Sequence, residues 1–224
     1  VLDRNSTVYT IDTDTDKQLL QKVIVLPNPN DMVIDKKNQI LYVKHDDSNK
    51  ISAVDLKDLH SQKNQDTINL KYKPGAMALA EDGSLHFTVG RIVSREVSRE
   101  GNQQIVNGLY KINEPYKLLN ANAQLHDELT NISSKIIDFG TNHDNGTGLE
   151  VIANAKKKLT YIMNNFTDTI AIVNDKVDVE KFVQVGESPN NIALDTEGNK
   201  MYVTSDEDTR HPLVVIDLKL PSTS

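Results

Sequence analysis

Several features on which common functions depend are missing from this chain of 224 residues. It contains no cysteine, which excludes disulfide bonds, thiolate catalysis and zinc sites that need cysteine ligands. No apolar run approaches the roughly 18 residues that a membrane-spanning helix requires, and the first residues lack the pattern of a signal peptide. The sequence therefore predicts no membrane span, and the lack of cysteine does not fix the compartment.

Positive charge is also scarce. The chain carries 25 Lys and Arg against 32 Asp and Glu, a formal net charge of -7. A nucleic-acid-binding domain normally carries a basic patch or stripe. The most arginine-rich segment, 91–107, interleaves its arginines with Glu96 and Glu100 and contains no aromatic residue on which a base could stack. We therefore expect no nucleic-acid partner.

Familiar catalytic motifs are missing as well. The chain has no Gly-x-Ser-x-Gly nucleophile elbow and no glycine-rich loop that would cradle a phosphate. Five histidines are dispersed along the chain without the spacing of a metal site: His45, His60, His86, His126 and His211. The sequence predicts no catalytic residue.

A repeat is the feature that the chain does have. In its clearest copy, Ser188 to Leu218, three short apolar segments at 192–195, 200–204 and 213–218 are separated by turn residues, and Glu197-Gly198-Asn199 supplies a tight hairpin. Related copies start at Pro29, Pro74 and Gly148. A period of roughly 40 to 45 residues with four strands is typical of a propeller blade.

We therefore predict an all-β fold, a β-propeller of four-stranded blades with about four blades present in one domain over 1–224. The expected units are a partial blade at 1–26, blades at 29–72, 74–139 and 148–185, and a partial blade at 189–218. Two insertions, 91–107 and 113–134, interrupt the second complete copy, and the latter includes a possible short helix at 121–129.

Two strands of the first complete copy read as continuous apolar runs. Met32 to Ile34 and Ile40 to Val43 do not alternate between apolar and polar residues. Such runs are typical of strands that are covered on both faces. We expect both strands to lie between two neighbouring sheets.

The repeat resembles that of a known family. Met201-Tyr202-Val203-Thr204 with Val215-Ile216-Asp217, and Ile40-Leu41-Tyr42-Val43 with Ala53-Val54-Asp55, are similar to the bacterial YVTN-type, YncE-like β-propeller repeat. The second copy departs from it, because Leu85 to Thr88 has lost the Tyr-Val pair. The motif marks structural positions, so it speaks to the fold and little to function.

The resemblance implies a secreted protein of the periplasm or cell surface, usually with seven blades. Members of the family act more often as binding scaffolds than as enzymes. The resemblance therefore implies that this chain is part of a longer propeller, whose open blade edges would pair with further blades or a partner. The alternative is a minimal four-blade ring in which the terminal pieces pair with each other.

Function is expected where loops gather at the channel mouth. The loops that enter the first strand of each blade and those that join its second and third strands lie on one face of a propeller. A protein or small-molecule ligand is predicted to bind there through Asn30, His45, Asp46, His143, Asp144, Asn145, Asn164, Asn190 and Asp206. Such oxygen-rich loops suit a hard cation such as Ca²⁺, although Asn and Asp also cap turns. No bound cofactor is otherwise expected.

An enzymatic alternative rests on Pro29-Asn30 and Pro189-Asn190. Metal-dependent lactonases of the gluconolactonase type present an asparagine to a divalent ion from such a dipeptide, so the resemblance implies metal candidates at Asn30 and Asn190. The sequence does not identify an acidic partner for them, and Asp35 and Asp195 fall at turns. The first expectation is a non-catalytic scaffold, and the alternative is a metal-dependent lactonase.

Overall fold

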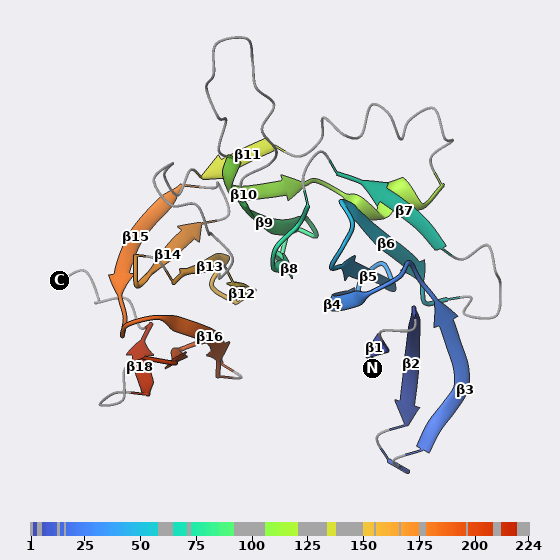
Figure 1. Cartoon of the computed structure of the whole chain (residues 1–224), viewed down its shortest axis with the longest axis horizontal. Helices are drawn as coiled ribbons and strands as arrows, with labels where there is room; N and C mark the ends of the chain where they lie inside the picture. The colour runs from blue at the N-terminus through green and yellow to red at the C-terminus, as the bar shows by residue number, and fades with distance from the viewer. Residues whose placement is uncertain are drawn as a thin grey trace, which may run out of the picture.

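The chain forms five small antiparallel sheets that succeed one another along an arc (Figure 1). The computed structural model describes residues 2–3, 6–12, 14–15, 17–57, 65–70, 73–91, 106–120, 134–137, 150–154, 156–165, 167–174, 178–195, 197–207 and 212–218. The expected helix at 121–129 lies outside these residues. The helical element that is described is a 3₁₀ helix, η1 (Pro115–Asn120), in the second insertion.

Each sheet is one blade, and its strands follow chain order. Blade 1 contains β1 (Leu2–Asp3), β2 (Thr7–Asp12) and β3 (Lys17–Ile24). Blade 2 contains β4 (Pro29–Asp35), β5 (Ile40–His45), β6 (Lys50–Asp55) and β7 (Gln65–Asn69). Blade 3 contains β8 (Met77–Leu79), β9 (Leu85–Arg91), β10 (Val106–Ile112) and β11 (Ser134–Ile137). Blade 4 contains β12 (Glu150–Asn154), β13 (Leu159–Asn164), β14 (Thr169–Asn174) and β15 (Val179–Gln184). Blade 5 contains β16 (Pro189–Leu194), β17 (Lys200–Ser205) and β18 (Leu213–Asp217).

The arrangement is that of a β-propeller, as the repeat predicts. The first strands β4, β8, β12 and β16 lie innermost and contact one another in this order, and the later strands of each blade lie further out (Figure 1). The two ends of the arc are blades 1 and 5, and each has three described strands. The blades therefore pack face to face around a common centre.

Apolar side chains between successive blades form the core. One cluster joins blade 2 to blade 3 and contains Tyr42, Ile51, Met77 and Phe87. Similar clusters join blade 1 to blade 2, blade 3 to blade 4 and blade 4 to blade 5. Because neighbouring residues of a strand point to opposite faces, the second strand of a central blade contributes to two clusters. All six residues of β5 are buried, which confirms the expectation for Ile40 to Val43.

The same expectation is wrong for β4. Met32 and Ile34 are 36% and 49% exposed, whereas Met77 and Ile192, which occupy the place of Met32 in blades 3 and 5, are 4% and 5% exposed. Both side chains face blade 1, because their partners across the strand pair, Val43 and Leu41, belong to the cluster with blade 1. β1 contacts β4, but blade 1 has no described strand between β1 and the centre of the arc, so this side of β4 is covered only in part.

Blade 5 presents an equally open face on its other side. Val214 and Ile216 of β18 pack toward blade 4, so Leu213 and Val215 point away from it. Leu213 and Val215 are each 52% exposed. Apolar side chains are thus open on the side of β4 that faces blade 1 and on the outer face of blade 5. In the part of the chain that the structure describes, no helix is long and apolar enough to cross a membrane.

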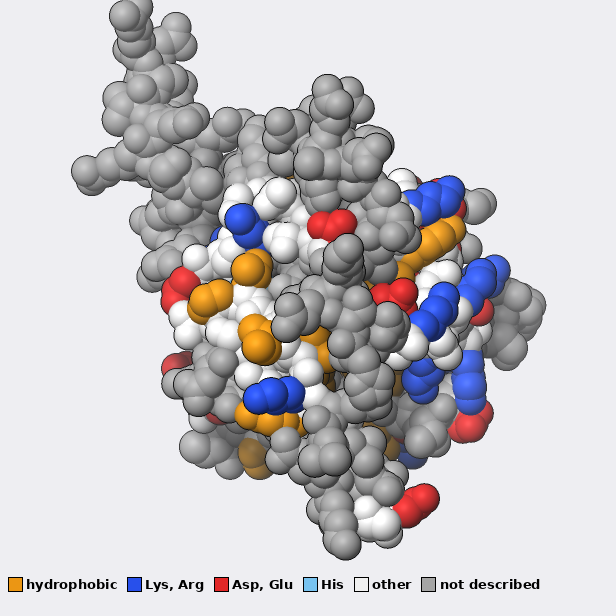
Figure 2. All heavy atoms as spheres, turned by 90° about the vertical axis from the view of Figure 1, so that its right-hand side faces the viewer, with side chains coloured by type: hydrophobic (Ala, Val, Ile, Leu, Met, Phe, Trp, Pro, Cys, Tyr) orange, Lys and Arg blue, Asp and Glu red, His pale blue; other side chains and the backbone are white. Residues whose placement is uncertain are grey.

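The surface near blades 1 and 2 is mixed in character. Figure 2 views the molecule from the side of β3 and β7 and shows lysine side chains interspersed with acidic and hydrophobic ones. Single exposed apolar residues such as Ile24 occur here too. This distribution agrees with the scattered lysines of the sequence.

Candidate functional site

One position of the repeat, which we call the tyrosine position, distinguishes blade 3 from the others. It is the third residue of the second strand, Tyr42 in blade 2, Tyr161 in blade 4 and Tyr202 in blade 5. Its side chain faces the next blade along the chain, and Tyr42 and Tyr161 are fully buried against that blade. A large apolar ring is therefore the usual filling between blades.

In blade 3 the tyrosine position holds His86, which is the second residue of β9 because this strand begins one residue later after its turn than β17 does. The backbone hydrogen bond from Ala80 to Ser84 closes the β8–β9 turn, as that from Asp195 to Lys200 closes the turn of blade 5. The residue two positions after the acceptor Ser84 is His86, and the residue two positions after the acceptor Lys200 is Tyr202, so the two are equivalent. His86 lies opposite Lys111 on β10, where blades 2 and 4 have Ala53 and Ile172. The face of blade 3 toward blade 4 is thus polar at this position.

The turn before His86 is also different. The β4–β5 turn is capped by Asp35, whose two oxygens accept hydrogen bonds from Asn38, and Asp195 caps the turn of blade 5 in a similar way. These contacts agree with the structural role expected for both aspartates.

Blade 3 has Ala80 at this place, and the carboxylate comes from Asp82 within the turn, where it accepts the backbone N–H of Ser84 at 2.9 Å.

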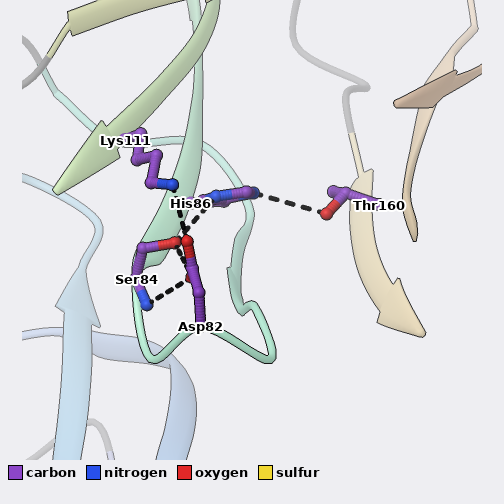
Figure 3. A network of polar contacts seen from close by, with 5 residues as sticks. All are labelled: Asp82, Ser84, His86, Lys111 and Thr160. Carbon is purple, nitrogen blue, oxygen red and sulfur yellow. Dashed lines mark hydrogen bonds and ion pairs between the residues drawn. The ribbon is translucent and has the colours of Figure 1, made fainter. Parts of the chain in front are cut away.

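Five side chains join in one polar network between blades 3 and 4 (Figure 3). Asp82 accepts an ion-paired hydrogen bond from Lys111 Nζ at 2.7 Å and a second hydrogen bond from the Ser84 hydroxyl. Ser84 Oγ lies 3.0 Å from His86 Nε2, and His86 Nδ1 lies 3.4 Å from Thr160 Oγ1 on β13. The network crosses the blade boundary at the contact between His86 and Thr160.

These contacts determine which ring nitrogen of His86 carries the proton. The Asp82 carboxylate can only accept, so the Ser84 hydroxyl donates to it and has only lone pairs left for His86. Nε2 must then donate to Ser84. Nδ1 of the neutral ring carries a lone pair, which accepts from the Thr160 hydroxyl. The acceptor nitrogen of His86 therefore faces blade 4.

Burial keeps this histidine neutral. His86 is 3% exposed, and burial together with the Lys111 charge lowers its pKa from 6.5 to about 4, against a smaller opposing effect of Asp82. The pKa of Asp82 falls to about 2: its partial burial acts to raise it, but the hydrogen bonds from Lys111 and Ser84 outweigh this effect. Near neutral pH the network contains one carboxylate, one ammonium and a neutral imidazole.

A pocket of about 250 Å³ opens beside the network. The turns of blades 3 and 4 line it, through Ala80, Glu81, Asp82, His86, Asn154, Lys158, Leu159 and Thr160. The side chains that replace the usual apolar filling are smaller or more polar: His86 replaces a tyrosine, and Thr160 stands where blades 2 and 5 have Leu41 and Met201. The pocket is a consequence of this local departure from the repeat.

The predicted channel mouth lies at the opposite ends of the same strands. There the structure brings Asn30 beside Asp46, and Asn190 beside Asp206, with the asparagine amide donating to the carboxylate in each pair. The four residues are exposed and occupy equivalent places in blades 2 and 5. Each pair joins the start of a first strand to the end of a second strand, as the loop positions predict.

Other residues predicted for the mouth have structural roles or are not described. His45 is fully buried. Its Nδ1 donates to the Pro27 carbonyl at 3.0 Å and its Nε2 accepts from Ser52 at 2.9 Å, so the prediction that His45 contacts a ligand is wrong. Asn164 is 9% exposed and accepts a backbone hydrogen bond from Thr167 at its own turn. His143, Asp144 and Asn145 lie outside the described residues.

Two carboxylates connect the innermost strands. Asp31 of blade 2 accepts the N–H of Met77 in blade 3 at 3.3 Å, and Glu150 of blade 4 accepts the N–H of Ile192 in blade 5 at 2.8 Å. Burial, and to a smaller extent the charge of Asp31, raise the pKa of Glu150. Blade 3 has Ala76 at the same repeat position, so the boundary between blades 3 and 4 lacks a carboxylate link of this kind.

The asparagines fit a metal ion poorly. Nδ2 of Asn190 donates to Asp206, and its Oδ1 accepts from the Thr204 hydroxyl, so the amide carbonyl and the carboxylate do not converge on one point. Among the residues described here, no three His, Asp or Glu side chains are grouped as metal ligands would be. We therefore derive no chemical step through a metal at this face.

Comparison of the sequence with known families and with curated proteins finds no match. No family model matches the chain, so membership of the YVTN-type family stays a prediction. No curated protein matches its sequence either.

Solved structures do match. The chain is similar to the hydrazine synthase of Kuenenia stuttgartiensis, with 12% identity and a TM-score of 0.64 over 96% of this chain and 66% of that one. It is similar to the dihydro-heme d1 dehydrogenase NirN in complex with DHE, with 11% identity and a TM-score of 0.61 over 96% of this chain and 40% of that one. Streptogramin B lyase follows with 10% identity and a TM-score of 0.54 over 97% of this chain and 63% of that one.

At these identities the likeness shows the fold alone. The chain is a β-propeller, and it spans 40 to 66% of the length of these three structures. Its neighbours include enzymes and, as a structure from Bacteroides caccae shows, proteins of unknown function. Function must therefore be argued from the sites of this chain.

Proposed function

We propose that this protein is a binding scaffold that holds a protein or small-molecule ligand at its channel mouth. The observation that carries the proposal is the repeated Asn–Asp pair, Asn30 with Asp46 and Asn190 with Asp206, exposed on two separate blades of one face. Two matching groups of donors and acceptors, held by rigid strand ends, suit a ligand that contacts several blades at once.

Charge favours a cationic ligand at this face. Asp31, Asp46, Asp47 and Asp206 all belong to the strand ends or loops of the mouth. The Asn28 amide donates to Asp47 at 3.0 Å, which adds a third Asn–Asp pair to the same rim. Carboxylates grouped on one face attract positive side chains, and they are also the ligands that Ca²⁺ prefers. Periplasmic or cell-surface localisation, which the family resemblance implies, belongs to this proposal.

The test is a calorimetric titration with CaCl₂ and, separately, with a tetralysine peptide. Asp46→Asn combined with Asp206→Asn should weaken binding of the effective probe several-fold, because charge and acceptor geometry are lost at two blades. The matched control combines Asp178→Asn with Glu197→Gln, which makes the same change in net charge on the loops at the opposite strand ends. Equal affinity in both double variants, or no binding of either probe to the unaltered protein, contradicts the proposal.

A metal-dependent lactonase is the second hypothesis. One observation favours it, since an acidic neighbour now stands beside each candidate asparagine. The orientation of the Asn190 amide opposes it. Hydrolysis of simple lactones in the presence of a divalent ion, lost on addition of a chelator and in Asn190→Ala, would support this activity. A lactone panel that remains unreacted with metal supplied would rule it out.

A further inference from the structure

We propose that the pocket between blades 3 and 4 is a second binding site, separate from the channel mouth, and that it takes a small zwitterion of amino-acid size. The pocket lies among the β8–β9 and β12–β13 turns. These turns are at the ends of the strands opposite to the mouth, so a ligand here would not compete for the rim carboxylates.

The departure from the repeat is the first argument. At one boundary, and on both blades that form it, polar side chains occupy positions that are apolar elsewhere: His86 and Lys111 on blade 3 and Thr160 on blade 4. A repeat stabilises itself best by keeping the same apolar contacts at every boundary. Polar substitutions that cross a core and leave a pocket therefore mark a functional position in preference to a stabilising one.

The size of the pocket is the second argument. A volume of about 250 Å³ lies below the roughly 300 to 1,000 Å³ of a typical drug-sized pocket. Ala80 and Leu159 supply an apolar wall, and the buried His86 and Thr160 supply the polar wall. The space suits a molecule with few heavy atoms and one short apolar portion.

The polar groups determine the charge of the ligand. Nδ1 of His86 and Oγ1 of Thr160 are both acceptors for an incoming donor, and their mutual contact of 3.4 Å is long enough to be replaced by one. Glu81 also lines the pocket, from the turn that carries Asp82. An ammonium group suits acceptors of this kind, because it has three donors and a positive charge.

A carboxylate would find its partner in Lys158. Lys158 lines the pocket from the turn of blade 4, while its neighbour Lys156 is held by Glu197 at 2.8 Å. Neither Lys158 nor Glu81 forms an ion pair with any residue that the structure describes. Glu81 and Lys158 therefore offer one charge of each sign from two blades, which suits a ligand with an ammonium group and a carboxylate.

The experiment is a calorimetric comparison of three probes at pH 7.5: L-alanine, ethylamine and propionate. Ethylamine is alanine without its carboxylate, and propionate is alanine without its ammonium group. We expect saturable 1:1 binding of alanine and at least tenfold weaker binding of the other two, since a charged hydrogen bond is worth about tenfold or more in affinity. Absence of saturable alanine binding at millimolar concentrations, or equal binding of alanine and ethylamine, overturns the proposal.

Variants identify the pocket as the site. Lys158→Gln should weaken alanine about tenfold and leave ethylamine unchanged, whereas Lys156→Gln, the control in the same turn, should change neither. His86→Tyr restores the residue of the other blades and should abolish binding by filling the space. If His86→Tyr does not fold, Thr160→Leu, which introduces the residue of blade 2, serves the same purpose. Alanine binding that survives both Lys158→Gln and the filling variant contradicts the assignment.

The channel-mouth variant Asp46→Asn with Asp206→Asn should bind alanine as the unaltered protein does. Loss of alanine binding in that variant would place the zwitterion at the mouth and overturn the second site. The outcomes for the two faces are thus separable in one set of titrations.

Discussion

His45 and His86 are both buried, yet they play different parts because their partners differ. His45 donates through Nδ1 to a backbone carbonyl and accepts through Nε2 from Ser52, all within blade 2 and the segment that leads into it. His86 donates through Nε2 to Ser84 and presents Nδ1 to Thr160 of the next blade. The first arrangement fixes a loop, whereas the second leaves an acceptor at a blade boundary beside a pocket.

Stability should depend on pH through His86. An unfolded histidine binds a proton below pH 6.5, whereas folded His86 does so only near its lowered pKa of about 4. Between these values the unfolded state binds more protons, so the free energy of unfolding should fall as pH decreases, by about 3 kcal/mol over the whole window. Urea denaturation at pH 7.5 and 4.5 measures this.

The control for that measurement is His86→Gln, which cannot titrate. Its free energy of unfolding should be lower than that of the unaltered protein at pH 7.5 but should change less between the two pH values. Other titrating groups, including His45 and Glu150, are common to both proteins and cancel in the comparison. Parallel pH dependence in the two proteins would show that His86 is protonated equally in the folded and unfolded states.

Among the structural elements, the hairpin between the first and second strands of blade 5 contacts the neighbouring blade directly. In blade 5, Gly198 has a φ of 65°, and its carbonyl accepts from the buried Asn154 of blade 4 at 2.9 Å. A Cβ at Gly198 would lie 2.3 Å from Asn154 Nδ2. The turn therefore needs glycine both for its backbone conformation and for its approach to the neighbouring blade.

Gly198→Ala should lower the free energy of unfolding by about 3 kcal/mol, the sum of left-handed backbone strain and displacement of Asn154. Gly83→Ala is the matched control, because Gly83 has a φ of 81° with nothing within 4 Å of its missing Cβ. That variant should cost only the backbone term, about 1 kcal/mol. Equal losses in the two variants, measured by thermal unfolding, would mean that the contact with Asn154 contributes nothing.

The strands could be predicted from the sequence, because their signal is local. Apolar segments of four to six residues, turn residues and a period near 40 residues all lie within a short stretch of chain. The network could not be predicted, because His86 and Thr160 are 74 positions apart and meet only through the packing of two blades. The loss of the Tyr-Val pair at Leu85 to Thr88 was its one visible sign, and it carries no information about Lys111 or Thr160.

The channel mouth was predictable in part for the same reason. Loop positions in a repeat follow from strand order, so Asn30 and Asp46 could be assigned to one face, as could Asn190 and Asp206. Burial does not follow from strand order. His45 comes directly before Asp46, but it is the last residue of β5, a strand that is buried along its whole length.

At the scale of the whole molecule, the arc ends at blade 5 in an apolar face that repeats the packing of its interior. Leu213 of β18 occupies the repeat position of Ile170 on β14, since they lie opposite Thr204 and Met163 at the same register. Ile170 is fully buried by blade 5, and Leu213 is 52% exposed. Exposed apolar sheet faces of this kind favour association with a further sheet.

The same substitution should therefore have different costs at the two positions. Ile170→Ala should lower the free energy of unfolding by about 3 kcal/mol because it leaves a cavity between blades 4 and 5. Leu213→Ala should cost less than about 1 kcal/mol, since a half-exposed side chain loses little burial. Urea denaturation of the two variants checks this, and a large cost at Leu213 would mean that the outer face of blade 5 is covered in solution.

The central claim of this account is that the propeller repeat changes at one blade boundary into a polar network that holds a neutral histidine. Nitrogen-15 NMR of the imidazole side chains, followed from pH 7.5 to pH 4, tests it most directly, with His86→Gln used to assign the signal. The account predicts a His86 ring with its proton on Nε2, hydrogen-bonded to Ser84, which stays neutral until the pH approaches 4. A ring that carries its proton on Nδ1, or that titrates near pH 6.5 as a solvated histidine does, would contradict it.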